Sequence, residues 1–125
     1  MSQVIRVAVP SNGAGGIDAP RSAHFGRADS FTIVEIADGS IVGGTSFVNP
    51  PHQQGGCGLT VAGLAEQGVS VAIVVGMGGG PLSAMNRLSI AAYHDDQSPT
   101  PRAAVEAFLA GALAAFDGSN VCSGH

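Results

Sequence analysis

The sequence contains no lysine and no tryptophan, and only 11% of its 125 residues are charged. All five basic side chains of the Lys and Arg class are arginine, and the formal net charge is -4. Nucleic-acid binding usually depends on clusters of Lys and Arg side chains that displace counterions from the phosphates. The composition therefore predicts a protein without a nucleic-acid partner.

Long hydrophobic runs and cysteines are also scarce. The first apolar run, residues 4–9, is too short for a membrane span or a signal sequence, and no basic residue precedes it. We therefore expect a cytoplasmic protein that does not bind membranes. In that reducing compartment, Cys57 and Cys122 are expected as free thiols or metal ligands rather than as a disulfide.

The apolar residues make up 45% of the chain, are mostly Ala, Val and Ile, and suit one aliphatic core. Neither an internal repeat nor a linker divides the sequence. We expect a single domain over residues 1–118 and a flexible C-terminal tail over residues 119–125.

The hydrophobic pattern predicts an α/β protein. Apolar and β-branched runs predict strands over residues 4–9, 30–36, 41–48, 69–75 and 90–93. Helical spacing predicts helices over residues 59–67, 82–88 and 102–116. Asp38-Gly39 predicts a tight hairpin turn between the second and third strands. Because crossover helices join parallel strands, the order β-β-β-α-β-α-β-α predicts a five-stranded mixed sheet with helices on its faces.

A glycine junction, Gly76-Met77-Gly78-Gly79-Gly80, links the fourth strand to the second helix. Backbone N–H groups at a helix N-terminus attract anions, and glycines allow a ligand to approach closely. The junction therefore predicts contact with an anion or a cluster, with plain turn chemistry as the alternative. A dinucleotide site is disfavoured, because Pro81 stands where the pattern G-x-G-x-x-G needs its last glycine.

Two loops carry candidate metal ligands. His52 and Cys57 lie in the glycine-rich segment 49–58, where an imidazole and a thiolate can converge on one soft or borderline metal ion. An incidental thiol on a polar loop is the alternative. His24 stands in the stretch His24-Phe25-Gly26-Arg27, and its alternative role is to fix that loop by hydrogen bonds.

Two other segments with histidine are weaker candidates. The stretch His94-Asp95-Asp96 follows the fifth strand, at the edge where open α/β sheets place ligands, but a solvated turn is the favoured interpretation. Cys122 and His125 bring two ligand types to a terminal tail, and such tails are usually mobile.

Catalytic motifs are missing from the sequence. It has no G-x-S-x-G nucleophile elbow, no H-E-x-x-H and no carboxylate cluster for two-metal hydrolysis. We therefore expect a protein that is not an enzyme.

Several of these features occur together in one known family. They are Val7-Ala8-Val9-Pro10, the motif His24-Phe25-Gly26-Arg27-Ala28 followed by Phe31, the loop 49–58, the glycine junction and the closing Cys122-x-x-His125. Over nearly its whole length the chain resembles the dinitrogenase iron-molybdenum cofactor-binding family, which comprises NifX-like and NifB C-terminal-like carriers. The His-Phe-Gly-Arg element before a hairpin is the specific part of this resemblance.

The resemblance implies a ribonuclease-H-like α/β fold. It also implies a carrier or chaperone that binds an iron-sulfur or molybdenum-containing cluster and delivers it between donor and acceptor proteins. The implied metal ligands are His24, His52 and Cys57. Further cofactor contacts are implied at His24, Arg27, Gly76, Met77, Gly78 and Gly79. These residues are expected to face one another across one end of the sheet.

The chain departs from the family pattern at two points. Ser89 stands where relatives commonly have glycine, and no lysine balances an anionic cofactor, a role that Arg21 and Arg27 can take. Many stand-alone members are not tied to nitrogen fixation, so the resemblance does not fix the cluster. Two other functions stay open: a non-enzymatic interaction or regulatory module, and a small enzyme that acts on an anionic metabolite with His94 or His52 as base.

Overall fold

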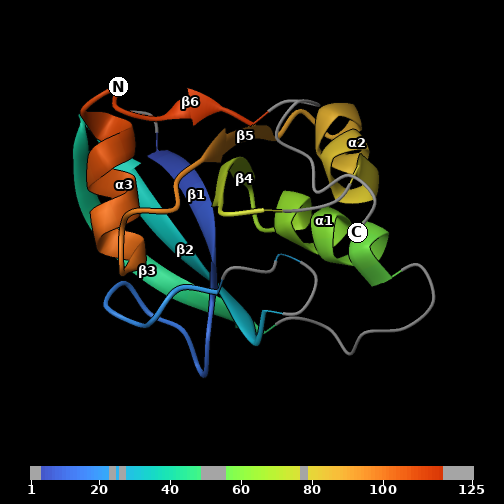
Figure 1. Ribbon diagram of the computed structural model, residues 1–125, viewed down its shortest axis with the longest axis horizontal. Helices are drawn as coiled ribbons and strands as arrows, with labels where there is room; N and C mark the ends of the chain where they lie inside the picture. The colour runs from blue at the N-terminus through green and yellow to red at the C-terminus, as the bar shows by residue number, and fades with distance from the viewer. Residues whose placement is uncertain (1–3, 23–24, 26–27, 49–55, 77–78, 117–125) are drawn as a thin grey trace.

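One mixed sheet with helices on both faces makes up the described part of the chain (Figure 1). The computed structural model describes residues 4–22, 25, 28–48, 56–76 and 79–116, with the backbone alone for residues 56–60 and 79–81. The strands are β1 (Val4–Ser11), β2 (Ser30–Ala37), β3 (Ser40–Val48), β4 (Val69–Val74), β5 (Ala91–His94) and β6 (Ala114–Ala115). The helices are α1 (Gly56–Glu66), α2 (Gly79–Arg87) and α3 (Pro101–Leu109).

The described strands lie in the order β3-β2-β1-β4-β5-β6. β1, β2 and β3 form an antiparallel meander, whereas β1 pairs with β4, and β4 with β5, in parallel. β6 closes the far edge by pairing antiparallel with β5. The mixed α/β sheet predicted from the sequence is confirmed. The ribonuclease-H-like label and the domain boundary at residue 118 stay predictions.

The turn between β2 and β3 has the predicted geometry. Asp38 and Gly39 have φ angles of 55° and 78°, and a two-residue hairpin loop of type I′ needs this left-handed conformation at both positions. Glycine adopts it without steric cost, and aspartate is one of the residues that tolerate it. The Asp-Gly pair therefore fixes the hairpin register, in which Ala37 faces Ser40.

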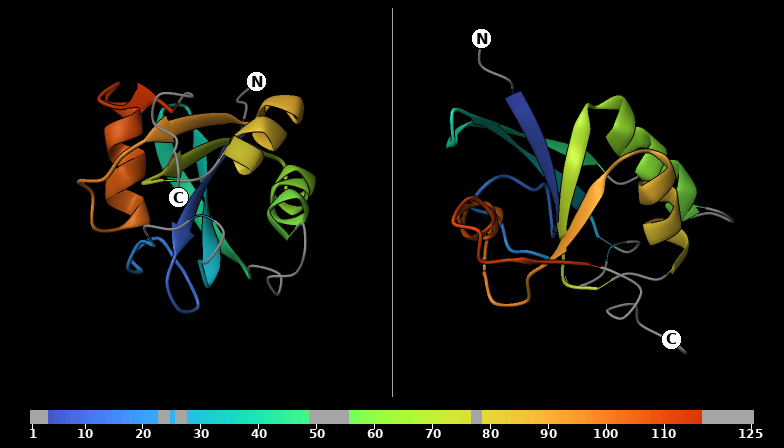
Figure 2. Two further views of the ribbon diagram at one scale, coloured as in Figure 1. Left: turned by 45° about the vertical axis from the view of Figure 1, so that its right-hand side comes forward. Right: turned by 90° about the horizontal axis from the view of Figure 1, so that it is seen from above.

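Side chains of the central strands alternate between two core clusters. In β1, Ala8 belongs to the cluster under α1 and α2, whereas Val7 and Val9 belong to the cluster under α3. Figure 2 shows the resulting layers, with α3 on one side of the sheet and α1 beside α2 on the other. Within the described residues, no helix is long and apolar enough to cross a membrane.

The prediction of a last helix over residues 102–116 is wrong for its C-terminal half. α3 ends at Leu109 rather than at residue 116, and Gly111 turns the chain with a φ of 74°. The chain then runs extended through β6, and the Phe116 N–H donates to a carbonyl of β5 at 2.8 Å. Leu113 packs against the cluster under α3, whereas Phe116 is buried in the opposite cluster. The apolar residues of this segment therefore pack around a sixth strand. The sequence predicted five strands and a longer helix instead.

Both crossover helices begin earlier than predicted. α1 begins at Gly56 rather than at residue 59, and α2 begins at Gly79 rather than at residue 82. Glycine has a low intrinsic helix propensity, so glycine-rich segments are predicted as loops, but tertiary packing overrides that preference. Here α1 and α2 pack against each other and against β4 and β5. Cys57, predicted in a loop, stands in the first turn of α1 as a result.

Gly111→Ala distinguishes the observed end of α3 from a longer helix. Apart from its chain neighbours, no described atom lies within 4 Å of the position of the new Cβ, so the effect is conformational. Alanine pays about 1 kcal/mol for a left-handed φ, and we expect urea denaturation to show that loss of stability. In a helix that continued to residue 116, the same change would raise stability by about 1 kcal/mol. Ala103→Gly, inside α3, is the control and should lower stability by about 1 kcal/mol.

Candidate functional site

Most strands of the sheet end on the same side. Ser11 pairs with Ser30, which in turn pairs with Val48, and Val74 pairs with His94. Since β1 and β4 are parallel, β1, β3, β4 and β5 all end here and β2 begins here. We call this side the carboxyl end of the sheet. Open α/β sheets bind ligands beyond the carboxyl ends of their strands.

The segments predicted to hold a cluster are attached to the carboxyl end. His24 and Arg27 belong to the connection between β1 and β2, and His52 belongs to the connection that leaves β3. Met77 and Gly78 belong to the connection that leaves β4. All five residues lie outside the described residues. Their assignment to the site therefore stays a prediction. The structure shows that the segments containing them are attached to the same end of the sheet.

The described residues that adjoin these segments are held in place by the core or by a helix. Phe25 and Ala28, on either side of residues 26–27, are buried in the cluster under α1 and α2. Gly76 is half-buried and follows β4 closely. Cys57 stands in the first turn of α1, and Gly79 is the first residue of α2. Each of these helices leads from the end of one strand to the start of a parallel one, so both begin at the carboxyl end.

Buried polar residues gather at the same end. Among the described residues, the buried polar or charged ones are Ser11, Ser22, Ser30, Thr32 and Asp95. All of them belong to the end of β1, the start of β2, the residue after β5 or the connection that pairs with the end of β1. Burying a polar group costs free energy unless the group is hydrogen-bonded. The fold therefore concentrates this cost at the carboxyl end.

One of these buried groups, the Asp95 carboxylate, forms an ion pair with Arg21. Nη1 of Arg21 lies 3.3 Å from Oδ2 of Asp95, and the two side chains are 5% and 4% exposed. The same nitrogen donates to the Ser98 carbonyl at 3.1 Å, and the Gln97 N–H donates to Oδ1 of Asp95 at 2.9 Å. The predicted solvated turn at residues 94–96 is wrong for Asp95, because its carboxylate is the counter-charge of a buried guanidinium.

Arg21 reaches Asp95 across the end of β4. Ser11 pairs with Ser30 on its β2 side and with Arg21 on its other side, which is the side of β1 where β4 ends. Asp95 directly follows β5, beyond β4, and its N–H donates to the Val74 carbonyl at 3.0 Å. The ion pair therefore joins the ends of β1 and β5 over the end of β4, beside the start of the glycine junction.

Burial and pairing shift the pKa of both groups. Burial lowers the pKa of the Arg21 guanidinium, and the negative charges of Asp95 and Asp96 oppose that shift. Burial also acts to raise the pKa of Asp95. Hydrogen bonds from Ser98 and Gln97, together with the charge of Arg21, outweigh it and lower that pKa below its ordinary value. The carboxylate is therefore ionised at neutral pH.

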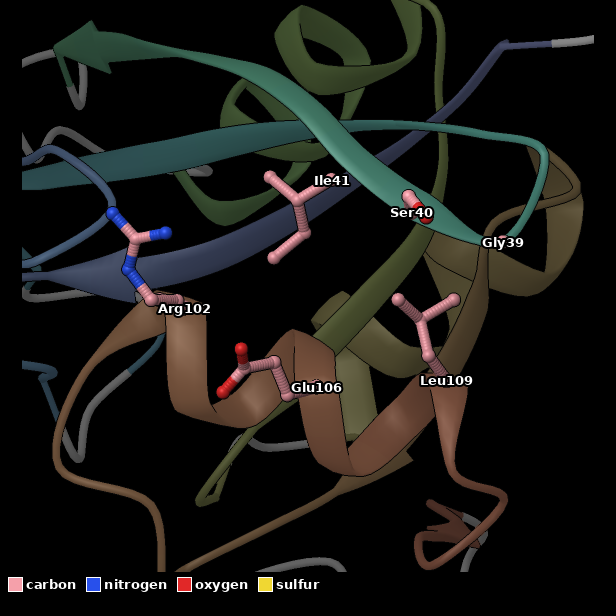
Figure 3. Close-up of a pocket in the computed structure, with 6 residues that line it drawn as sticks. All are labelled: Gly39, Ser40, Ile41, Arg102, Glu106 and Leu109. Atoms are coloured by element: carbon pink, nitrogen blue, oxygen red, sulfur yellow. The ribbon is translucent and has the colours of Figure 1, made fainter.

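A pocket lies at the opposite end of the sheet, between the β2–β3 turn and α3. Its volume is about 410 Å³, and it is lined by Gly39, Ser40, Ile41, Arg102, Glu106 and Leu109 (Figure 3). The Asp18 carboxylate accepts two hydrogen bonds, of 2.9 and 3.0 Å, from Arg102 of this pocket. None of the predicted site residues lines the pocket, so its shape does not bear on the predicted site.

No metal centre can be assembled from the side chains that the structure describes. Among them, no three His, Cys, Asp or Glu side chains come close enough to hold a metal ion. The predicted ligands are not part of that set, since His24, His52 and the side chain of Cys57 lie outside the described residues. The metal site therefore stays a prediction.

The Arg21–Asp95 pair is the feature that sequence reasoning missed. The sequence predicts that Arg21 balances an anionic cofactor, but it does not predict Asp95 as a partner of Arg21. The two residues are 74 positions apart, and no local pattern connects them. The one signal that places Asp95 near the carboxyl end is that it lies two residues after the predicted strand 90–93.

Asp95→Asn tests whether the buried charge of Arg21 depends on Asp95 as its counter-charge. Without the carboxylate, the buried charge of Arg21 has lost its counter-charge, so we expect the free energy of unfolding at neutral pH to fall by about 3 kcal/mol. Asp96→Asn changes an exposed neighbour and is the control, with an expected effect below about 0.5 kcal/mol. An Asp95→Asn chain as stable as the wild-type chain would contradict the assigned role.

The ion pair also makes stability depend on pH. The pKa of Asp95 is lower in the folded chain than the value of about 3.9 expected in the unfolded chain. Its stabilising effect is therefore complete above that pH and is lost as the pH falls through the lowered folded value. Urea denaturation should show a loss of stability below about pH 4 that is smaller in Asp95→Asn than in the wild-type chain. Equal acid sensitivity of the two proteins would show that Asp95 does not cause it.

The sequence matches the model of a known protein family. The family model described as dinitrogenase iron-molybdenum cofactor matches residues 3–111. An uncharacterized protein of Methanocaldococcus jannaschii is 32% identical over 118 residues, which cover 92% of this chain and 94% of that protein.

Solved structures share the fold. The apo form of the orange protein from Desulfovibrio gigas matches with a TM-score of 0.80 at 26% identity, covering 94% of this chain and 98% of that one. A Thermotoga protein provisionally named a NifB protein matches with a TM-score of 0.72 at 25% identity, covering 89% of this chain and 92% of that one. Sequence and fold agree, and the chain belongs to the dinitrogenase iron-molybdenum cofactor family.

Proposed function

We propose that the chain binds a metal-sulfur cluster at the carboxyl end of its sheet and delivers it to a partner protein in the cytoplasm. The cargo is an iron-sulfur or molybdenum-containing cluster, and the chain is a carrier rather than an enzyme. One topological observation carries this proposal. The connections that contain His24 and His52, the glycine junction and the first turn of α1 all start at that end. Membership of an iron-molybdenum cofactor family supports a metal cluster as the ligand.

The proposed metal ligands are two imidazoles and one thiolate, from His24, His52 and Cys57. Thiolates and imidazoles are the ligands that iron-sulfur clusters and soft or borderline metals take in proteins. Three protein ligands leave most bonds of the cluster to its own sulfides. Such sparse ligation favours transfer to an acceptor over permanent binding.

Arg27 and residues 76–79 are proposed to surround the cluster. Gly79 begins α2, and the N–H groups at a helix N-terminus donate to negatively charged acceptors and are favoured there by the helix dipole. Glycines have no Cβ, so a bulky ligand can approach their backbone closely. The junction then contributes hydrogen bonds to sulfide or oxo groups without adding a metal ligand.

The described residues favour a carrier over the alternative of a small enzyme. The Asp95 carboxylate is engaged by Arg21 and Gln97, so it is not available to orient a histidine base. The ring of His94 lies 6.1 Å from the ring of Phe116 and packs against it. Among the described residues, His94 therefore has no carboxylate partner that would orient it as a general base.

Anaerobic reconstitution with iron, sulfide and molybdate tests the proposed binding. We expect the wild-type chain to take up metal and to gain visible absorption, measured by metal analysis and spectroscopy. Cys57→Ser and His24→Ala each remove a proposed ligand and should weaken uptake by about tenfold or more. His94→Gln is the control, because His94 lies at the same end of the sheet but outside the proposed ligands.

A wild-type chain that stays colourless and takes up no metal would overturn the proposed function. Delivery is measured separately, by mixing the loaded chain with an apo-ferredoxin and following the cluster after the two proteins are separated. A cluster that never leaves the chain would contradict the carrier role. Cys122→Ser, measured in parallel, decides whether Cys122 and His125 take part in binding.

A further inference from the structure

Arg21 uses one of its three guanidinium nitrogens for bonds to the described chain. Nη1 serves Asp95 and Ser98, whereas Nε and Nη2 are buried without a hydrogen-bond partner among the described residues. Buried polar groups are almost always paired, and a bare charged donor is costlier than a neutral one. The two free donors of Arg21 are therefore not explained by the stability of the fold.

Nε and Nη2 lie on one edge of the guanidinium plane and form a fork of two parallel donors. Arg102 shows within this chain what such a fork binds, since its Nε and Nη2 donate to the two carboxylate oxygens of Asp18 at 2.9 and 3.0 Å. The fork of Arg21 has the same geometry, suited to two acceptor atoms of one anion. The difference is burial, because the side chain of Arg102 is 43% exposed and that of Arg21 only 5%.

Asp95 orients this fork and leaves it free. The Asp95 carboxylate accepts a hydrogen bond from Nη1 of the guanidinium, and the Gln97 N–H holds that carboxylate in place. A donor pair that is already oriented loses little conformational entropy when a ligand binds. Hydrogen bonds to an anion are also stronger in the low dielectric of a buried site than in water. The guanidinium lies at the carboxyl end of the sheet, over the end of β4.

We propose that Arg21 binds an anionic ligand through two parallel hydrogen bonds, from Nε and Nη2 to two oxo or sulfido atoms on one face of that ligand. This inference builds on the proposed function and names the chemical class of the cargo. The cargo is an anion with at least two terminal acceptor atoms, as in a tetrahedral oxyanion of molybdenum or its sulfur analogue. The metal ligands proposed above then hold the metal, and Arg21 recognises the charge and shape of the group around it.

Titration calorimetry with molybdate tests the role of Arg21. We expect the wild-type chain to bind molybdate and Arg21→Lys to bind it at least about tenfold more weakly, because lysine keeps a charge beside Asp95 but lacks the fork. Arg102→Lys is the matched control and should leave the affinity unchanged, since Asp18 already occupies its fork.

A second variant covers the case in which Arg21→Lys does not fold. Arg21→Met combined with Asp95→Leu replaces the whole buried pair with apolar side chains, a change that proteins commonly tolerate. Circular dichroism checks the fold, and the double variant should show the same loss of molybdate affinity. Equal affinity of the wild-type chain and the folded Arg21 variants would overturn the inference. A wild-type chain that binds no molybdate would overturn it as well.

Cluster uptake separates this inference from the proposed function. A chain that binds molybdate through Arg21 but takes up no metal-sulfur cluster would retain the inference and remove the proposed function. Cluster uptake together with a molybdate affinity that the Arg21 variants leave unchanged would retain the proposed function and remove the inference.

Discussion

Parallel pairing of β1 with β4, and of β4 with β5, is the constraint on which the rest of the structure depends. A parallel neighbour can be reached only by a crossover, so α1 and α2 each return the chain from the carboxyl end of the sheet to its opposite end. Both helices cover the same face, where they share one core cluster. The antiparallel hairpin of β1 and β2 adds its connection at the carboxyl end too. Strand pairing by itself therefore gathers the segments that carry the proposed ligands.

The few charged residues of this chain connect parts that are distant in sequence. Arg102 and Asp18 are 84 positions apart, and Arg21 and Asp95 are 74 apart. The first pair is exposed, and exposed pairs contribute little to stability. A buried pair is also weak evidence for stability, because desolvating two charges offsets much of their attraction, even though removing one partner alone is costly. The Arg21–Asp95 pair is thus better explained as an arrangement that orients a guanidinium than as a source of stability.

Features that depend on neighbouring residues were predictable from the sequence, and those that depend on the sheet order were not. The strands and the turn at Asp38 and Gly39 follow from local patterns. The attachment of the predicted ligands to one end of the sheet does not, because it depends on the pairing of strands that are distant in sequence. The end of α3 does not, because Leu113 and Phe116 have helical spacing while their burial in opposite clusters depends on the pairing of β6 with β5. The burial of Asp95 likewise depends on which connection crosses the end of β4.

The distribution of buried polar groups supports the carboxyl end as the proposed binding site independently of topology. A fold selected for stability alone gains nothing from collecting such groups at one end, yet within the described residues they all lie there and none lies near the β2–β3 turn. Ser30 adds to this cost, since its buried Oγ has no hydrogen-bond partner in the described chain. The backbone packs so closely there that a Cβ at Gly15 would lie 2.7 Å from that oxygen. Local departures from the rules of stable packing are typical of functional sites. Strand topology determines at which end of the sheet the connections start, and core composition determines where polar side chains are buried. These two properties are unrelated, yet both single out the carboxyl end, where the Arg21–Asp95 ion pair joins the ends of β1 and β5.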